Sequence, residues 1–221
     1  MTADRVVVLR HGRTTFNHTG TWQGQRDVPL DEVGHLQAKA AAPVLRELLP
    51  TAIVSSDLAR AWDTAEVIGI ATGVDVTADP RLREVDVGRW EGLTAQEITA
   101  LGDGDLLAAW RRGEDVPVGG AERPSELGRR GAQALREHAA GLDGGVLLVV
   151  AHGALIRTST LTLLGIEQNR WAGLGALGNC SWGLLAPREP WWRLLTWGVS
   201  APEPTSGAPS ATGANGSSAS V

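Results

Sequence analysis

The sequence predicts a three-layer α/β/α sandwich with a mostly parallel central sheet. Short apolar runs at residues 5–9, 52–54 and 146–150 alternate with longer segments that have helical periodicity. Because strands that alternate with helices favour a parallel sheet covered on both faces, this pattern predicts the α/β class. The chain of 221 residues is long enough to give such a domain a full hydrophobic core.

The first strand and the first helix are separated by a long connection. Residues 13–30, which follow the strand at 5–9, are loop-like because they contain several glycines and a proline. A helix is predicted over 31–49, with a kink at Pro43. The apolar stripe of this helix consists of Leu36, Ala40, Val44, Leu45 and Leu48.

A second unit of strand and helix follows. The short strand at 52–54 leads into Ser55-Ser56-Asp57, whose side chains are good N-cap residues for a helix over 58–72. Another short strand is predicted at 74–76. The apolar face of the helix is made up of Leu58, Ala61, Trp62, Ala65 and Ile68.

The second half of the chain continues the alternation and closes with two strands, which we expect to pair in an antiparallel manner. Its predicted elements are helices at 95–110, 125–142 and 155–164, and strands at 146–150, 180–185 and 192–197. We expect residues 1–200 to form one domain. Residues 201–221 are rich in Ser, Gly, Ala and Pro, so they cannot bury enough apolar surface and are expected to be a disordered tail.

Charge and cysteine content narrow the classes of partner and compartment. The net charge of −5 disfavours general nucleic-acid binding. Cys180 is the single cysteine, so no intramolecular disulfide can form, which suits a reducing cytoplasm. The chain shows no signal-peptide pattern and no apolar stretch of the roughly 20 residues that span a bilayer. We therefore expect a cytoplasmic protein without nucleic-acid or membrane partners.

Reactive side chains follow several of the strand-like runs. They are Arg10-His11, Arg60, Glu84 and His152. Ligands in such sheets bind at the carboxyl ends of the strands, so these side chains are expected to share one site. Two guanidiniums can clamp a phosphate, and a neutral histidine can attack phosphorus. A carboxylic acid can protonate the departing alkoxide, and a second, protonated histidine can stabilise the transferring group.

This set suffices for phosphoryl transfer through a phosphohistidine. The two histidines together with Glu84 and Asp86 could also bind zinc, judged by ligand type alone. The neighbouring arginines argue against a metal, because they repel a cation and attract an anion. We therefore expect neither a metal nor a cofactor.

Five motifs occur in order over about residues 5–198. They are Arg10-His11-Gly12-Arg13-Thr14 with Asn17; Gln23-Gly24 with Asp27, Pro29, Leu30, Gly34 and Gln37-Ala38; Ser55-Ser56-Asp57-Leu58-Ala59-Arg60-Ala61 with Thr64-Ala65; Leu82-Arg83-Glu84 with Gly88, Trp90, Glu91 and Gly92; and Ala151-His152-Gly153. In these motifs the chain resembles the histidine phosphatase superfamily, the phosphoglycerate-mutase-like proteins. The resemblance implies that family's fold.

The resemblance also implies a role for each catalytic candidate. His11 resembles the nucleophile that becomes phosphorylated, and Glu84 resembles the proton donor. The phosphate would dock between Arg10, Arg60 and His152. His11 must then be neutral, with its other ring nitrogen donating to a backbone carbonyl.

Further residues are implied to bind the phosphate or the leaving group. Asn17 and the backbone at Gly153 would donate to phosphate oxygens, while Gln23 and Gly24 would line the mouth of the pocket. Asp86 lies two residues after Glu84 and is a second candidate for the acid.

Within the family, the segment 84–92 resembles the phosphatase branch. Segments 178–182 and 192–197 resemble an actinobacterial group of phosphatases that act on glucosyl-3-phosphoglycerate. The implied activity is metal-independent hydrolysis of a small phosphorylated metabolite, such as glucosyl-3-phosphoglycerate or a related sugar or glycerate phosphate. The alternatives are a cofactor-dependent phosphoglycerate mutase and a catalytically weak phosphate-binding regulatory protein. The resemblance also suggests a homodimer.

Other conspicuous side chains have simpler interpretations. Surface solvation is expected for His18, His35 and His138. Arg13 and Arg83 are expected at the surface, although either could contact a substrate carboxylate. Because Trp22 precedes the Gln23-Gly24 step, it is a candidate for the pocket wall.

Overall fold

The computed structural model describes residues 2–167 and 173–202, so the expected tail lies outside the described residues from 203 onward. Its central sheet has six strands: β1 (Arg5–Arg10), β2 (Pro50–Ser55), β3 (Val76–Ala78), β4 (Val146–Ala151), β5 (Ser181–Ala186) and β6 (Arg193–Ser200). They lie side by side in the order β3-β2-β4-β1-β5-β6. The first four in this order are parallel, and β5 and β6 are antiparallel to their neighbours. The predicted sheet class is confirmed.

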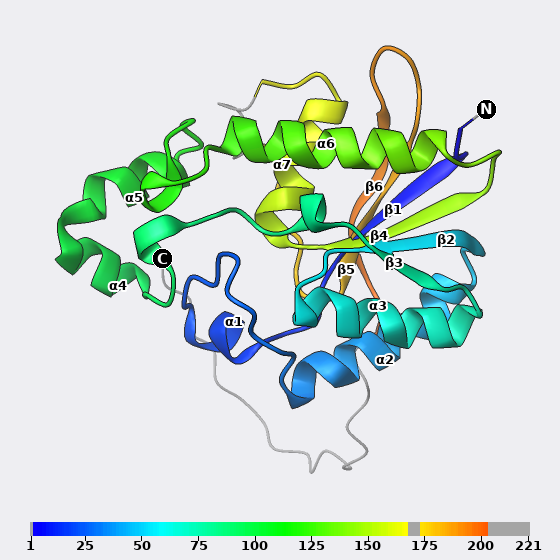
Figure 1. The fold of residues 1–221 in the computed structure, drawn as a ribbon, viewed down its shortest axis with the longest axis horizontal. Coiled ribbons are helices and arrows are strands. Elements are labelled where there is room, and N and C mark those ends of the chain that lie inside the picture. The colour runs from blue at the N-terminus through cyan, green and yellow to red at the C-terminus, as the bar shows by residue number, and fades with distance from the viewer. Residues whose placement is uncertain (1, 168–172, 203–221) are drawn as a thin grey trace, which may run out of the picture.

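Helices cover both faces of the sheet (Figure 1). One face packs against α6 (Pro124–Ala140) and α7 (Gly153–Leu163), and the other packs against α2 (Glu32–Arg46) and α3 (Ala59–Thr72). Alternate residues of β1 serve the two layers: Val6 and Val8 belong to the first core, and Val7 and Leu9 to the second. This continuous apolar run is typical of a parallel strand that is buried on both faces.

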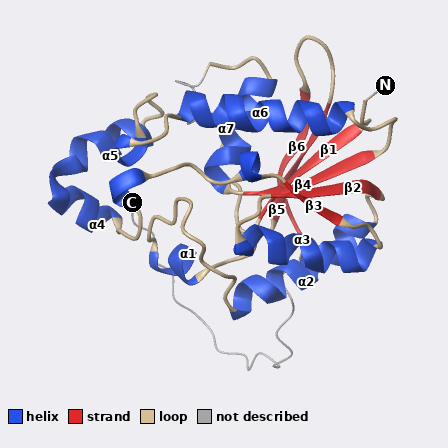
Figure 2. Cartoon of the chain, in the orientation of Figure 1, coloured by secondary structure: helices blue, strands red, loops and turns tan. Residues whose placement is uncertain are grey.

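Three shorter helices lie beyond the carboxyl ends of the parallel strands (Figure 2). They are α1 (Thr15–Thr19), α4 (Ala95–Ile98) and α5 (Gly104–Arg111). The prediction of a single helix over 95–110 was wrong. A π-helical segment, Thr99–Asp103, separates α4 from α5, and Gly102 inside it has φ = +94°. That left-handed conformation ends regular helix geometry and turns α5 back towards the site.

Two expectations about helix faces also need correction. In α2, Leu45 is buried as predicted, but Leu36 is 52% exposed and Val44 is 37% exposed. The buried side chains of α2 are instead mainly alanines, which let it approach α3 closely. The N-cap of α3 is Leu58, without a side-chain hydrogen bond, and not the expected Ser-Ser-Asp segment.

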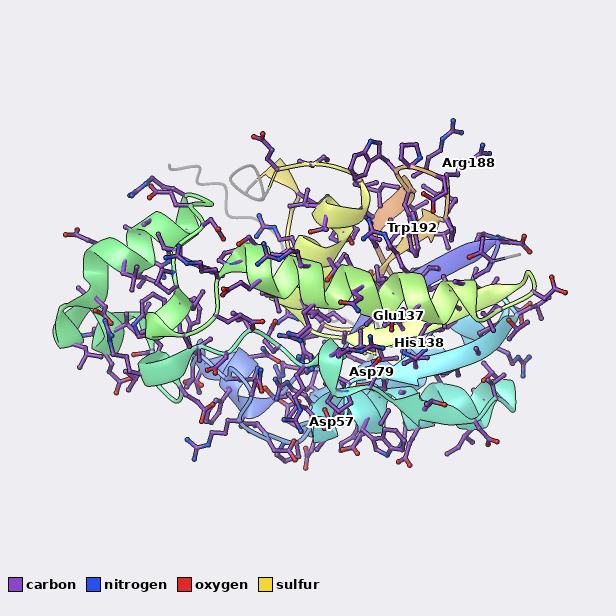
Figure 3. The ribbon with its side chains drawn as sticks, turned by 45° about the horizontal axis from the view of Figure 1, so that its top comes forward. Asp57, Asp79, Glu137, His138, Arg188 and Trp192 are labelled. Atoms are coloured by element: carbon purple, nitrogen blue, oxygen red, sulfur yellow. The ribbon has the colours of Figure 1, made fainter. Side chains whose placement is uncertain are left out.

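An ionic cluster joins the segment after β3 to α6, and Figure 3 shows three of its members, Asp79, Glu137 and His138, close together. Arg81 bridges Asp79 and Glu137, and Nε2 of His138 lies 2.8 Å from Oδ2 of Asp79. His138 is therefore half-buried and paired, whereas surface solvation was expected. The cluster fixes the backbone a few residues before Glu84. Among the described residues, no helix has the length and apolarity needed to cross a membrane.

Candidate active site

The adjacent parallel strands β1 and β4 bring the two His-Gly steps together. Arg10 is paired with Ala151 in the register, and His11 N donates to Ala151 O over 3.0 Å. His11 and His152 therefore leave the sheet side by side, with ring centroids 5.1 Å apart. The glycine after His11 serves packing, because a Cβ at Gly12 would lie 2.6 Å from the carbonyl oxygen of Gly34.

A cavity of about 210 Å³ opens at this edge of the sheet. All of the site residues implied by the sequence line it except His152. The lining side chains and backbone come from Arg10, His11, Asn17, Thr21, Trp22, Gln23, Gly24, Arg60, Glu84, Val85, Val87, Trp110, Gly153, Ala154, Arg157 and Ala176. Trp22 lines the cavity as expected, in edge contact with Trp110 at 4.8 Å between ring centroids.

His11 is 2% exposed, and the backbone carbonyl of the next residue, Gly12, holds its ring in one orientation. Nδ1 lies 2.6 Å from the carbonyl oxygen of Gly12. Because a carbonyl can only accept, Nδ1 carries the proton and Nε2 keeps its lone pair. Burial, followed by the charges of Arg60 and Arg10, holds the pKa of His11 well below its usual value of 6.5. The ring is thus neutral at physiological pH.

Arg60 is fully buried at the start of α3, and hydrogen bonds fix its guanidinium. Nη1 donates to the carbonyl oxygen of Arg26 at 2.8 Å, and Nη2 donates to that of Gly24 at 2.9 Å. Nε donates to Nδ1 of His152 at 3.2 Å. Burial lowers the pKa of Arg60 to about 10, with the charge of Glu84 opposing the shift, so it stays protonated at neutral pH.

Arg10 supplies the second guanidinium. Its Nη1 donates to the carbonyl oxygen of Leu177 over 2.6 Å. Its Nε is buried and has no hydrogen-bond partner among the described residues. An unsatisfied buried donor is costly, so this atom marks a position where an anionic acceptor would be stabilised. Gly153 packs against the same guanidinium and leaves space for it.

His152 lies behind the cavity and is fully buried. Because Nδ1 accepts from Arg60, the ring proton is on Nε2, which lies 2.9 Å from Oγ of Ser56. Burial and the charge of Arg60 hold the pKa of His152 well below 6.5. The second, protonated histidine that was expected to stabilise the transferring group is therefore disfavoured in this structure, and both ring nitrogens of His152 already have partners.

Glu84 reaches the site from the segment after β3, and its carboxylate sits on the first turn of α7. Oε1 accepts from the backbone N–H groups of Val85 and Leu155 at 3.0 Å, and Oε2 accepts from that of Ala154 at 3.2 Å. The backbone of this segment is also held, since Arg130 donates to the carbonyl oxygens of Arg81, Arg83 and Glu84. The carboxylate is thereby placed at a defined point on the cavity wall.

The two amide side chains of the site are oriented by Thr14. Oγ1 of Thr14 lies 2.9 Å from Oε1 of Gln23 and 3.1 Å from Oδ1 of Asn17. Asn179 also donates to Oδ1 of Asn17 at 3.2 Å and to the carbonyl oxygen of His11 at 3.0 Å. With their oxygens engaged, Asn17 and Gln23 have their N–H₂ ends left to donate to a bound anion.

Three side chains that the sequence left ambiguous lie away from the cavity lining. Asp86 is exposed and accepts from the backbone N–H of Gly88 at 2.9 Å, which leaves Glu84 as the carboxylate of the cavity. Arg13 pairs with Asp31 at 2.8 Å, and Arg83 pairs with Asp57.

Other lining residues were not predicted at all. Trp110 lies on α5 and reaches the cavity only because the helix break brings α5 back. Arg157 lies on α7, one turn after Gly153, so helical spacing from the fourth motif could have found it. Thr14 and Asn179 act behind the lining. The spacing of Thr14 and Asn17 is a helix-capping pattern that could have indicated their contact, whereas no local pattern indicates the hydrogen bonds of Asn179.

Comparisons with known proteins agree with this geometry. The model of the histidine phosphatase superfamily (branch 1) matches residues 6–200. The glucosyl-3-phosphoglycerate phosphatase of Mycolicibacterium vanbaalenii is 40% identical over 220 residues, covering 91% of this chain and 97% of the relative. A Salmonella paratyphi C protein named probable phosphoglycerate mutase GpmB is 35% identical over 201 residues, covering 88% and 90%.

A solved structure of a related enzyme also resembles this chain in sequence and in fold. The mycobacterial glucosyl-3-phosphoglycerate phosphatase in complex with VO3 has a TM-score of 0.83 and 40% identity to this chain, covering 90% of this chain and 100% of that one. The family model and the first relative each match most of the sequence. This chain therefore belongs to branch 1 of the histidine phosphatase superfamily.

Proposed function

We propose that the protein is a phosphomonoesterase in which His11 becomes phosphorylated. One observation carries the mechanism: His11 is neutral, with its Nδ1 proton held by Gly12 and Nε2 left as a nucleophile beside the guanidiniums of Arg10 and Arg60. Arg10 and Arg60 neutralise the phosphate dianion, and Nε of Arg10, which has no partner among the described residues, gains an acceptor when the phosphate binds. The N–H₂ groups of Asn17 and Gln23 complete the set of donors.

The reaction takes place in two balanced steps. In the first, Nε2 of His11 forms a bond to phosphorus, the ester P–O bond breaks, and protonated Glu84 delivers its proton to the leaving oxygen. In the second, Glu84 takes a proton from water, whose oxygen attacks phosphorus, and the N–P bond breaks. Inorganic phosphate leaves, and His11 returns to its neutral form.

His152 acts in this scheme through Arg60. Its Nδ1 orients the guanidinium of Arg60, and Ser56 in turn orients the imidazole ring. We assign His152 as a positioning residue, because it is fully buried and both ring nitrogens have partners.

The substrate is proposed to be glucosyl-3-phosphoglycerate or a related sugar or glycerate phosphate. The name of the M. vanbaalenii relative supports this class. The cavity supports it as well, since the indoles of Trp22 and Trp110 provide apolar faces beside the phosphate donors. Such faces suit a sugar ring, which presents C–H groups to aromatic side chains.

The test is phosphate release from glucosyl-3-phosphoglycerate, combined with trapping of the phosphoenzyme. The wild-type protein should release inorganic phosphate and carry label from a ³²P-ester after an alkaline quench. His11→Ala should lose both signals, while His35→Ala, at an exposed histidine, should keep them. Activity retained in His11→Ala would overturn the mechanism.

Two other activities are outcomes of the same experiment. The relative named probable phosphoglycerate mutase GpmB makes mutase chemistry the second candidate. Isomerisation of 3-phosphoglycerate without phosphate release would establish it in place of hydrolysis. Tight phosphate binding without turnover on any ester would instead identify a regulatory protein.

A further inference from the structure

The carbonyl that holds the Nδ1 proton of His11 belongs to the peptide group between Gly12 and Arg13. The N–H of the same peptide group donates to Oε1 of Gln37 over 2.9 Å. One rigid, planar unit therefore carries two hydrogen bonds, since it donates to Gln37 and accepts from His11 over 2.6 Å. Gln37 is thus connected to the imidazole through a single peptide plane.

Gln37 lies on α2, and the start of that helix packs directly against the loop after β1. A Cβ at Gly34 would lie 2.1 Å from the carbonyl oxygen of Arg13, so a glycine is needed for this close approach. Gln37 follows Gly34 by three residues and lies on the same side of the helix. The N-cap residue Asp31 holds Arg13 as well, because its backbone N–H donates to the carbonyl oxygen of Arg13 over 3.0 Å.

The direction of the Gln37 hydrogen bond matters for the imidazole. A backbone N–H can only donate, so the oxygen of the Gln37 amide must face it. An acceptor on the N–H side polarises the peptide group and makes its carbonyl oxygen a stronger acceptor. The same bond keeps the peptide plane from rotating away from Nδ1 of His11. Both effects favour the tautomer with the proton on Nδ1, which leaves the lone pair on Nε2.

We infer that Gln37 is a positioning residue for the nucleophile: its amide oxygen holds the 12–13 peptide group so that the Gly12 carbonyl keeps the proton of His11 on Nδ1. For catalysis this inference rests on the proposed function, in which Nε2 attacks phosphorus. Gln37 is outside the described cavity lining, so it acts on the reacting atoms only through the peptide group and the ring. It therefore affects the rate of attack and not the binding of the phosphate.

The test compares two variants of Gln37. Gln37→Met keeps the length of the side chain without an oxygen acceptor, and Gln37→Glu keeps an oxygen acceptor. Two-bond ¹H–¹⁵N NMR spectra at neutral pH identify the protonated ring nitrogen of each histidine, and the His11→Asn spectrum assigns the signals of His11. The wild type and Gln37→Glu should have the proton on Nδ1. Gln37→Met should add a population with the proton on Nε2.

Kinetics and phosphate binding supply two further readouts. The rate of phosphoenzyme formation at saturating substrate should fall about tenfold in Gln37→Met and stay within about threefold of wild type in Gln37→Glu. The Kd of inorganic phosphate should stay within about threefold in both, because the hydrogen bonds that hold Arg60 come from other segments. Gln133→Met, at an exposed glutamine of α6, should leave all three readouts at their wild-type values.

The outcomes distinguish this inference from the proposed function. If Gln37→Met keeps either the Nδ1 tautomer or the wild-type rate, or if Gln37→Glu loses as much as Gln37→Met, the amide oxygen does not position His11 and the phosphatase assignment stands. A loss of phosphate affinity equal to the loss of rate would show that Gln37 only supports the loop, and would also overturn the inference. If the wild type hydrolyses no ester, the proposed function fails, and the tautomer spectra alone decide whether Gln37 sets the protonation of His11.

Discussion

The Nε–H group of Arg60 donates to Nδ1 of His152 across 3.2 Å, so a histidine outside the described cavity lining holds a guanidinium inside it. This bond predicts which side chains can replace His152. At position 152, the side-chain amide of an asparagine can take the place of Nδ1, and its oxygen can accept from Arg60. The longer side chain of a glutamine places its amide where Nε2 lies. We expect kcat/KM to fall by about tenfold to a hundredfold in His152→Ala. The fall in kcat/KM should be smaller in His152→Asn than in His152→Gln. Steady-state kinetics with one ester would measure all three.

The reverse order would contradict this assignment. If glutamine rescued activity better than asparagine, Nε2 would be the atom that matters, and positioning of Arg60 through Nδ1 would not be the role of His152.

If Glu84 is the proton donor, the loss of rate on replacing it should depend on the leaving group of the ester. Glu84→Gln keeps the shape of the side chain but cannot deliver a proton. We expect kcat to fall by about 10²–10⁴ for an alkyl phosphate, whose alkoxide needs protonation, and much less for p-nitrophenyl phosphate. Asp86→Asn, at the exposed neighbouring carboxylate, should leave both rates near wild type. Equal losses on the two esters in Glu84→Gln would show that the residue does not act as the acid.

The backbone conformation and surroundings of Gly24 predict that a side chain at this position would clash next to the site. Gly24 has φ = +53°, and a Cβ there would lie 2.5 Å from Cγ2 of Val87. Gly20 has φ = +69°, but a Cβ there would meet nothing within 4 Å, which makes it a matched control. Gly20→Ala should cost about 1–2 kcal/mol of stability from conformation alone. Gly24→Ala should cost more and also lower kcat/KM, because the carbonyl oxygen of Gly24 holds Arg60.

Urea unfolding and kinetics on the two alanine variants would check this prediction. Equal loss of stability with unchanged kcat/KM would mean that Val87 moves aside and the clash has no effect on the site. The double variant Gly24→Ala/Val87→Ala should recover only the steric part of the loss, since the strained φ remains.

The mostly parallel sheet and the meeting of the histidines could be predicted from sequence because they depend on local signals. A buried run that ends in His-Gly marks a strand end, and parallel strands bring such ends to one edge of the sheet. The resemblance to a family was not needed for that step, because Arg10 ends β1, His11 follows it directly, and His152 follows β4 directly.

Other features depend on contacts between distant segments, and the sequence pattern could not reveal them. Helical periodicity placed Leu36 and Val44 of α2 in the core, but close packing against α3 selects the small side chains instead. Solvation was the default for His138, whose partner Asp79 is 59 residues away. Trp110 reaches the cavity only through the break at Gly102, where a glycine inside a helical pattern gave a weak signal.

The lowered pKa values of His11 and His152 predict how stability depends on pH. Each histidine titrates near 6.5 when unfolded and well below that when folded, so below pH 6.5 the unfolded chain binds more protons. The free energy of unfolding must therefore fall as the pH is lowered below 6.5, by up to about 1.4 kcal/mol per pH unit for each histidine.

The His11→Asn variant should lack one of these two contributions, so its free energy of unfolding should fall less steeply between pH 6.5 and 5. Urea unfolding at several pH values would measure the two slopes. A His11→Asn slope equal to that of wild type would show that His11 becomes protonated in the folded protein.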